Sequence, residues 1–337
     1  MFFFFLYWVS SSFKHSSHDN ILTREEYTSL KYYGVSLTSK NFISKNQFSE
    51  LNPDWLSLVD GNKKIHQISL PGTHETCARH GGYYYQCQEL SLMDQLMSGV
   101  RFFDIRCRHI NDVFMIHHGS VYQELGFGSG VRNVCIDFLK SHPNEFIYMC
   151  IKEEYTSTGN TKTFAETMLE YINGDIGDEQ KNDISEYFYL ATGTPTLNEV
   201  RGKIVLLRRF KNELPIDMGN EVFFQDDVTF TSYSTITARV QDQYVVSSLF
   251  DRSKKWSHVN SLLEEAKLRT DPNELFMNFA SGYSSLCFPY STAEYVTPLV
   301  GNYLKDTEPN AFVGVILFDF INLYFDNIIQ LVIQRNY

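Results

Sequence analysis

Three features are scarce or absent in this sequence, and each absence excludes a class of protein. The net charge is −11, so the chain lacks the basic surface that a general nucleic-acid-binding protein needs for phosphate backbones. The six cysteines include no Cys-X-X-Cys pair, so neither a zinc ribbon nor a dithiol redox motif is indicated. After the apolar N-terminus, no segment is long and apolar enough to be predicted as a transmembrane helix.

The cysteines around residue 80 could in principle serve a metal site or a disulfide bond. His74, Cys77, His80 and Cys87 are metal-ligating residue types, but their spacing fits no common metal site, so no metal is expected there. Cys77 and Cys87 fall in one predicted loop and are candidates for a disulfide bond if the protein is exported.

The N-terminal part of the chain predicts an extension rather than a folded domain. Residues 1–9 are almost wholly apolar and are followed by three serines, which resembles a secretory signal without its usual basic leader. They are too few to span a bilayer as a helix. We therefore expect residues 1–53 to be an extension with a signal or membrane tether, in a secreted or membrane-associated protein. A single domain is expected over residues 54–337.

From residue 54 onward, apolar strand-like runs alternate with amphipathic helix-like runs. Strands are predicted at residues 65–70, 100–107, 113–117, 146–151, 204–207, 275–279 and 313–318, with a looser β region at 222–246. Helices are predicted at residues 92–98, 131–141, 163–172, 254–268 and 292–304. This alternation is typical of an α/β fold with a parallel sheet, and about eight strands favour a TIM-like (β/α)8 barrel.

Polar residues recur at the carboxyl ends of the predicted strands, where the active site of such a barrel forms. Asp104 and Arg106 are two residues apart and therefore share one face of their strand. The other strand ends carry His74, His118, Lys152, Glu154, Arg209, Asp242, Tyr244 and Asp319. A single charged strand end usually just meets solvent, but a run of them on apolar strands predicts a site.

These residue types suit cleavage of a phosphodiester next to a polyhydroxylated ring. His74 and His118 are candidates for a general base and a general acid. Arg106 between them would bind an anionic phosphate and offset the charge that develops as phosphorus is attacked. Asp319 is suited to holding one imidazole in its reactive tautomer. Donors and acceptors for a polyol, with one aromatic face, are offered by Lys152, Glu154, Arg209, Asp242 and Tyr244.

Short motifs that run in order from about Trp55 to the C-terminus resemble the bacterial phosphatidylinositol-specific phospholipase C family. They are Ile-Ser-Leu-Pro-Gly-Thr-His (68–74), Arg-Phe-Phe-Asp-Ile-Arg (101–106), Ile-His-His-Gly (116–119), Phe-Leu-Lys-Ser-His-Pro-Asn-Glu (138–145), Ile-Lys-Glu-Glu-Tyr (151–155), Arg-Gly-Lys-Ile-Val-Leu-Leu-Arg-Arg-Phe (201–210), Val-Gln-Asp-Gln-Tyr (240–244) and Val-Gly-Val-Ile-Leu-Phe-Asp-Phe-Ile-Asn (313–322). The resemblance implies a distorted (β/α)8 barrel, in agreement with the strand pattern.

The resemblance also implies a role for each site residue. His74 would take the proton from the inositol 2-hydroxyl with Asp319 as its orienting carboxylate, and His118 would protonate the departing diacylglycerol oxygen. Arg106 would clamp the phosphate where the calcium-dependent relatives hold a metal, so a mechanism without metal or cofactor is expected. The inositol contacts would be Lys152, Glu154, Arg209 and Asp242, with Tyr244 as the stacking ring.

The sequence departs from the family pattern at two places. The family usually has Asp where this chain has Glu75, a longer carboxylate that is expected to support Arg106 and His118. The loop at residues 281–290 lacks the tryptophan that bacterial members use at the membrane. A substitute rim, or aromatic packing over the barrel edge, is expected from Tyr83, Tyr84, Tyr85, Tyr283, Leu286, Phe288 and Tyr290.

Two functions follow from these observations. The first is an active lyase that cleaves phosphatidylinositol, or a glycosylphosphatidylinositol, to diacylglycerol and inositol 1,2-cyclic phosphate. The second is an inositol-lipid-binding barrel with weak or no turnover that acts at membrane surfaces. Retention of both histidines, the arginine and the aspartate favours the enzyme, because loss of any one of them would abolish most of the rate. We expect a monomer that meets its lipid at a membrane interface and binds no nucleic acid.

Overall fold

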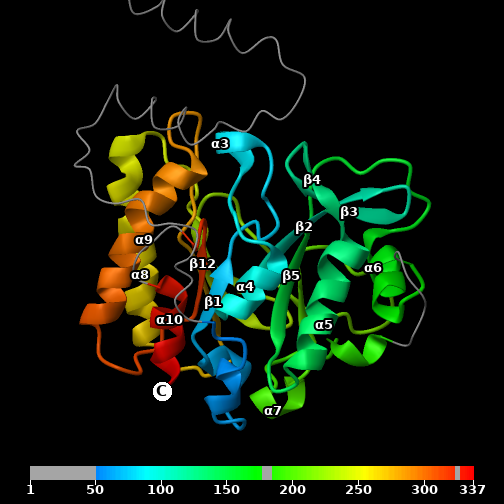
Figure 1. Ribbon diagram of the computed structural model, residues 1–337, viewed down its shortest axis with the longest axis horizontal. Coiled ribbons are helices and arrows are strands. Elements are labelled where there is room, and N and C mark those ends of the chain that lie inside the picture. Colours follow the sequence, from blue (N-terminus) through cyan, green and yellow to red (C-terminus); the bar gives the residue numbers. More distant parts are fainter. Residues whose placement is uncertain (1–50, 177–183, 323–326) are drawn as a thin grey trace, which may run out of the picture. The chain divides into compact units, whose positions relative to one another are not determined.

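The computed structural model describes residues 51–176, 184–322 and 327–337 of the chain (Figure 1). The predicted signal or tether and most of the predicted extension lie outside these residues. The domain boundary after residue 53 therefore stays a prediction. Among the described residues, no helix combines the length and the apolar character that crossing a membrane requires.

One sheet organises the described residues. Its neighbouring strands run in the order β6-β7-β5-β2-β1-β12-β11-β10-β9, and every pair in this path is parallel except β10 with β9. The strands of the path are β1 (Leu70–Thr73), β2 (Phe102–Ile110), β5 (Ile147–Glu153), β6 (Phe188–Tyr189), β7 (Ile204–Arg208), β9 (Thr229–Tyr233), β10 (Thr237–Gln241), β11 (Leu275–Phe279) and β12 (Val315–Phe318). Off the path lie β3 (Val113–His118), β4 (Val121–Gly126) and β8 (Asn220–Glu221).

The predicted parallel α/β fold is confirmed, and its distortion takes the form of an open sheet. Within the described ranges no pairing joins β6 to β9, so the barrel is not closed by hydrogen bonds. At the β9 edge the direction reverses, because β9 and β10 form an antiparallel hairpin instead of a crossover. The β3–β4 hairpin adds a second antiparallel feature on β2.

Helices connect the parallel strands as the sequence pattern predicts. They are α3 (Gly82–Tyr85), α4 (Leu92–Ser98), α5 (Val134–Ser141), α6 (Phe164–Asn173), α7 (Leu197–Val200), α8 (Arg252–Lys267), α9 (Pro289–Asp306) and α10 (Ile328–Ile333). Local chemistry sets the ends of α6, where Thr163 and Glu166 form a capping box and Gly174 adopts the left-handed conformation. Figure 1 shows α8 and α9 side by side next to β12, with α5 and α6 across the sheet from them.

The first predicted strand is wrong in position. Residues 65–67 form a 3-10 helix, and the strand begins at Leu70 and includes Pro71 and Gly72. A proline is tolerated here because the amides of Leu70 and His74 donate to the β12 side, so position 71 faces β2, which begins only opposite Gly72. Gly72 is needed for close approach, since a Cβ there would lie 3.2 Å from the Phe102 Cβ.

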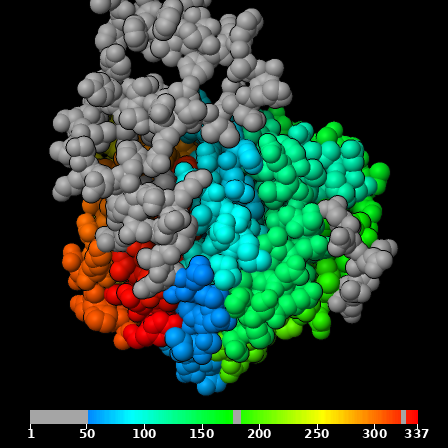
Figure 2. All heavy atoms as spheres, viewed as in Figure 1, coloured from blue at the N-terminus to red at the C-terminus, as the bar shows by residue number. Residues whose placement is uncertain are grey.

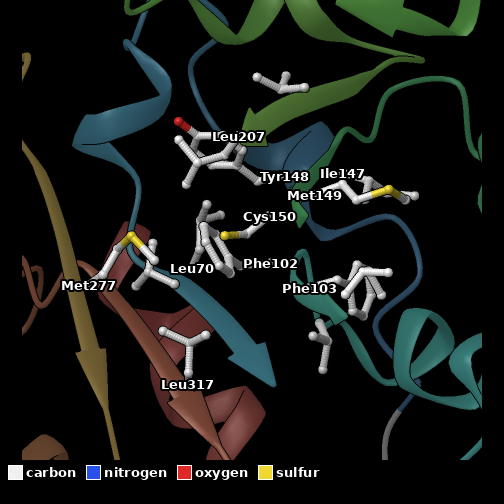
Figure 3. Close-up of a cluster of buried hydrophobic side chains, with 14 of the residues drawn as sticks. Leu70, Phe102, Phe103, Ile147, Tyr148, Met149, Cys150, Leu207, Met277 and Leu317 are labelled. Carbon is white, nitrogen blue, oxygen red and sulfur yellow. The ribbon is translucent and has the colours of Figure 1, made fainter. Parts of the chain in front are cut away.

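The core is a continuous apolar cluster between the strands and the helices. Figure 3 shows side chains from neighbouring strands packed together in it, among them Leu70, Phe102, Cys150, Met277 and Leu317. Each fully buried side chain of this size contributes about 1.5–3 kcal/mol to the free energy of unfolding. The rigid sheet that results holds the strand ends in fixed positions.

The first and last described segments lie side by side. In Figure 2 the residues just after position 50 (blue) contact the C-terminal residues (red) on one face. The Tyr337 hydroxyl donates to the Trp55 carbonyl at 2.7 Å, and the Ser69 amide donates to Asn336 Oδ1 at 2.9 Å. The C-terminal residues therefore stabilise the approach to β1, the strand that delivers His74.

Candidate active site

The carboxyl ends of neighbouring parallel strands bring most of the predicted side chains to one edge of the sheet. His74 follows β1, Asp319 follows β12, and His118 ends β3. Asp104 and Arg106 lie on β2, and the remaining strand ends supply Lys152, Glu154, Arg209 and Asp242. The order of the strands in the sheet thus brings side chains that are far apart in the sequence close together in space.

His74 is held by Asp319 in the tautomer that a general base needs. Nδ1 of His74 lies 2.9 Å from Oδ1 of Asp319, whose carboxylate is almost fully buried. Because the carboxylate accepts a hydrogen bond from Nδ1–H, Nε2 carries no proton and can receive one from a substrate. Burial by itself lowers the pKa of His74, but the charge and hydrogen bond of Asp319 outweigh burial, and the pKa is raised overall.

The guanidinium group of Arg106 is held in position by two carboxyl groups, those of Glu75 and Asp104. Its Nη1 lies 2.6 Å from Glu75 Oε1, and its Nη2 and Nε lie 3.0 and 3.2 Å from Asp104 Oδ2. Asp104 also accepts the Glu75 main-chain amide at 3.1 Å, so it fixes both ends of this arrangement. Burial opposes the charge of Arg106, but the carboxylates raise its pKa, and the guanidinium stays charged. The geometry suits a fixed anion clamp.

His118 and Glu75 form a coupled pair. The Tyr85 carbonyl, which can only accept, lies 2.7 Å from His118 Nδ1, so that nitrogen carries a proton and Nε2 faces Glu75 Oε1 at 3.6 Å. Burial, assisted by Arg106, lowers the pKa of His118 to about 4. Burial raises the pKa of Glu75 to about 8, although Arg106 acts in the opposite direction. Between these values the pair holds one titratable proton.

Backbone strain is found in the turns that follow β1 and β12. Glu75, directly after His74, has a φ of 43°, and Phe320, directly after Asp319, has a φ of 51°. Non-glycine residues in this left-handed region cost about 1–2 kcal/mol each, and such residues cluster at functional sites. The strain is offset by a side chain that the sequence did not single out. Buried Gln88 donates from Nε2 to the carbonyls of His74 and Phe318 at 2.9 and 2.8 Å, which ties the two turns together.

The predicted ring-binding residues are only partly brought together by direct contacts. Lys152 Nζ lies 2.8 Å from Glu154 Oε2, and the other oxygen of Glu154 accepts the Gly119 amide at 2.9 Å. Arg209 lies 3.6 Å from Asp104 and stacks on the ring of Phe224 at 3.4 Å. Burial raises the pKa of the Asp242 carboxyl.

Tyr244 is oriented by a hydrogen bond, since its hydroxyl donates to Asp226 at 2.9 Å. Phe224, which supports Arg209, and Asp226, which holds Tyr244, were not identified from the sequence. Both lie in the loosely patterned β region, where only the fold shows which side chain supports which.

The disulfide that the sequence left open is not formed, because Cys77 and Cys87 are both free buried thiols. The Cys87 sulfur points instead into the site, 3.9 Å from His118 Nδ1. Within the described residues, the side chains that could hold a metal ion are those of His74, Cys87 and Asp319, whose ligand atoms all lie within 4.8 Å of one another. This set differs from the one considered from sequence spacing, and it uses the proposed base and its aspartate.

Comparison with known proteins agrees with this geometry. Residues 69–210 match the family model described as phosphatidylinositol-specific phospholipase C, X domain. This region is therefore similar to the X domain of that family. It is 28% identical over 318 residues to a 1-phosphatidylinositol phosphodiesterase of Staphylococcus aureus (strain Newman), covering 87% of this chain and 97% of that protein. A protein of the same name from Listeria monocytogenes is 27% identical over 300 residues, covering 85% and 86%.

Solved structures extend the similarity beyond the X domain. The crystal structure of a pentafluoro-Phe phosphatidylinositol-specific phospholipase C from Staphylococcus aureus has a TM-score of 0.76 and 28% identity, covering 85% of this chain and 97% of that one. The phosphatidylinositol-specific phospholipase C of Listeria monocytogenes has a TM-score of 0.68 and 25% identity, covering 86% and 100%. The C-terminal half, which supplies Asp242 and Asp319, thus belongs to the same fold.

The Glu75–His118 pair makes pH dependence a direct test of the site. In an assay of inositol phosphodiester cleavage, kcat/KM is expected to rise as His74 loses its proton, at a pH above the ordinary range of histidine because Asp319 raises its pKa. It should fall near pH 8, as the Glu75–His118 pair loses its proton. In Glu75→Gln the alkaline limb should shift to lower pH by more than about one unit, because His118 alone binds its proton weakly. Glu75→Asp should keep both limbs.

The matched control is Glu124→Gln, which removes an exposed carboxylate near His80. Rate measurements from pH 5 to 10 on a water-soluble inositol phosphodiester would separate catalysis from lipid binding. Superimposable profiles for wild type and Glu75→Gln would show that the carboxylate does not share the catalytic proton.

Proposed function

We propose that this chain is a metal-independent phosphatidylinositol-specific phospholipase C that cleaves its lipid to diacylglycerol and inositol 1,2-cyclic phosphate. The observation that carries the proposal is the placement of His74 with Asp319 on one side and His118 with Glu75 on the other, with Arg106 beside Glu75. One base, one acid and one fixed cation are the groups that an in-line displacement at phosphorus requires. The names of the similar proteins support the same chemistry.

In the proposed reaction, the inositol 2-hydroxyl oxygen attacks phosphorus while its proton passes to Nε2 of His74. Arg106 stabilises the negative charge that develops on the phosphoryl oxygens. The bond from phosphorus to the diacylglycerol oxygen breaks, and that oxygen takes the proton held by the His118–Glu75 pair. The proton gained by His74 is stabilised by Asp319, which is why the raised pKa of His74 suits a base.

Aromatic and aliphatic side chains near α3 and α9 support a membrane-facing role. Tyr83 and Tyr84 are each about two-fifths exposed and pack on Phe288 with ring centroids 4.6 and 4.9 Å apart. Leu286 is 69% exposed beyond them. Of the predicted rim, Tyr290 packs against Phe320 and Tyr85 against His118, so these two support the site rather than the surface.

We further propose that the protein acts as a monomer at a membrane interface, in a secreted or membrane-associated location. Its substrate would be phosphatidylinositol or a glycosylphosphatidylinositol, since Lys152, Glu154, Arg209 and Asp242 address a polyol rather than the lipid tails. A related structural study concerns membrane binding of the Staphylococcus aureus enzyme. The alternative, an inositol-lipid-binding barrel without turnover, is an outcome of the experiment below.

Purified protein should release diacylglycerol and a cyclic inositol phosphate from phosphatidylinositol vesicles at an unchanged rate in the presence of EDTA. Arg106 supplies the fixed positive charge, so no metal is required. Phosphorus NMR identifies the cyclic product, and the same assay on a glycosylphosphatidylinositol substrate gives the preference. Loss of activity in EDTA that calcium restores would contradict the role of Arg106. Vesicle binding without any cleavage would favour the lipid-binding alternative.

A further inference from the structure

A buried lysine lies beneath the ring-binding side of the site. Lys255, on α8, is 2% exposed, and its ammonium group donates to Gln241 Oε1 at 3.0 Å and to the Gln243 carbonyl at 2.9 Å. These two acceptors flank Asp242 in the chain. Through these two hydrogen bonds Lys255 holds the chain in place at the carboxyl end of β10. We call these two hydrogen bonds the clamp.

The clamp is part of a satisfied polar network. Gln241 donates from Nε2 to Asn278 Oδ1 at 2.8 Å and to the Phe279 carbonyl at 2.9 Å, and its Oε1 also accepts the Gln243 amide at 2.8 Å. Asn278 in turn donates to the Val259 carbonyl of α8 at 2.9 Å. One network thus joins β10, β11 and α8 around a single cation.

A buried ammonium group is costly for a fold, and a well-packed apolar residue is often cheaper. Among the described residues, the groups that accept hydrogen bonds from this nitrogen are neutral oxygens. The charges of Asp242, Asp227 and Asp319 act on it over longer range, and the imidazole of His258 lies on the same helix. The cation is therefore placed to act on carboxylates at the site rather than to form an ion pair of its own.

We propose that Lys255 is a positioning residue that fixes residues 241–243, so that the Asp242 carboxylate between them is held where it accepts hydrogen bonds from hydroxyls of a polyol ring. The inference rests on the proposed function, because it assigns Asp242 to the ring. Burial lowers the pKa of Lys255 to about 8 and raises that of Asp242, where the positive charges of Arg209 first and then of Lys255 act in the opposite direction. The charged form of Lys255 thus predominates below about pH 8 and is progressively lost above it.

The test compares Lys255→Met with Lys254→Met, which removes the exposed neighbouring lysine on the same helix. In Lys255→Met, KM for a soluble inositol phosphodiester should rise about tenfold, with kcat changed by less than about threefold. Lys254→Met should match wild type. If folded Lys255→Met has an unchanged KM, the proposal is overturned, whether kcat falls or stays the same.

Binding of myo-inositol to the wild-type protein, measured by calorimetry from pH 6 to 10, keeps the proposal testable if Lys255→Met does not fold. Affinity should fall above about pH 8, and Lys255→Arg should remove this dependence because its cation does not titrate there. Wild-type affinity that is flat to pH 10 overturns the proposal. Absence of phospholipid cleavage together with intact inositol binding would overturn the proposed reaction and leave the role of Lys255 standing.

Discussion

Replacement of His74 or of His118 by alanine is expected to reduce turnover by several powers of ten. Each proton transfer contributes roughly 10²–10⁴-fold, and without it either the attacking hydroxyl or the leaving oxygen must exchange its proton with water. The structure supports two separate roles, since His74 is fixed by Asp319 and His118 by the Tyr85 carbonyl. The two losses should not add fully in the double variant, because the two residues serve one displacement.

The measurement is the single-turnover rate on phosphatidylinositol vesicles, with thermal unfolding as the check on the fold. His80→Ala is a matched control, since its side chain lies in the same region of the chain but outside the cluster. Either variant that keeps a tenth of the wild-type rate would refute the acid–base assignment.

The second large effect is expected for Arg106→Met. Loss of one preorganised donor to a developing oxyanion typically costs about 10²–10³-fold in rate. The substitution also breaks the buried ion pair of Arg106 with Asp104, which should lower the free energy of unfolding by about 3 kcal/mol. Asp104 then keeps only Arg209, 3.6 Å away, as a cationic neighbour. Arg106→Lys should recover stability better than rate, because a point charge cannot make the forked contact with both carboxylates and the phosphate.

Arg108→Met is the control, because Arg108 lies on the same strand but donates to the Thr156 carbonyl and stacks on Tyr155. Denaturant unfolding and kcat/KM should be measured on the same preparations. A normal rate in folded Arg106→Met, with or without calcium, would remove the phosphate clamp from the mechanism.

Local patterns in the sequence were enough to predict the class of fold and most of the cluster. Alternation of apolar strands and helices implies parallel strands, and parallel strands place their carboxyl ends at one edge. That rule grouped His74, Arg106 and Asp319, and the structure pairs His74 with Asp319. His118 joins the cluster for another reason, because β3 runs back antiparallel along β2 and brings His118 to the same Glu75 carboxylate as Arg106. A supporting role of Glu75 toward Arg106 and His118 was implied by the family resemblance and not by the strand pattern, and its carboxylate lies near both side chains.

The tertiary structure decided everything that depends on which side chain meets which across the sheet. The position of β1, the open edge between β6 and β9, and the free thiol of Cys87 have no periodic signal. The supporting roles of Gln88 and Lys255 also arise from contacts between segments far apart in the chain. The physical reason is that hydrophobic period and strand order are local properties of the chain, whereas a hydrogen-bond partner or a burial-induced pKa shift exists only once the chain has closed around it.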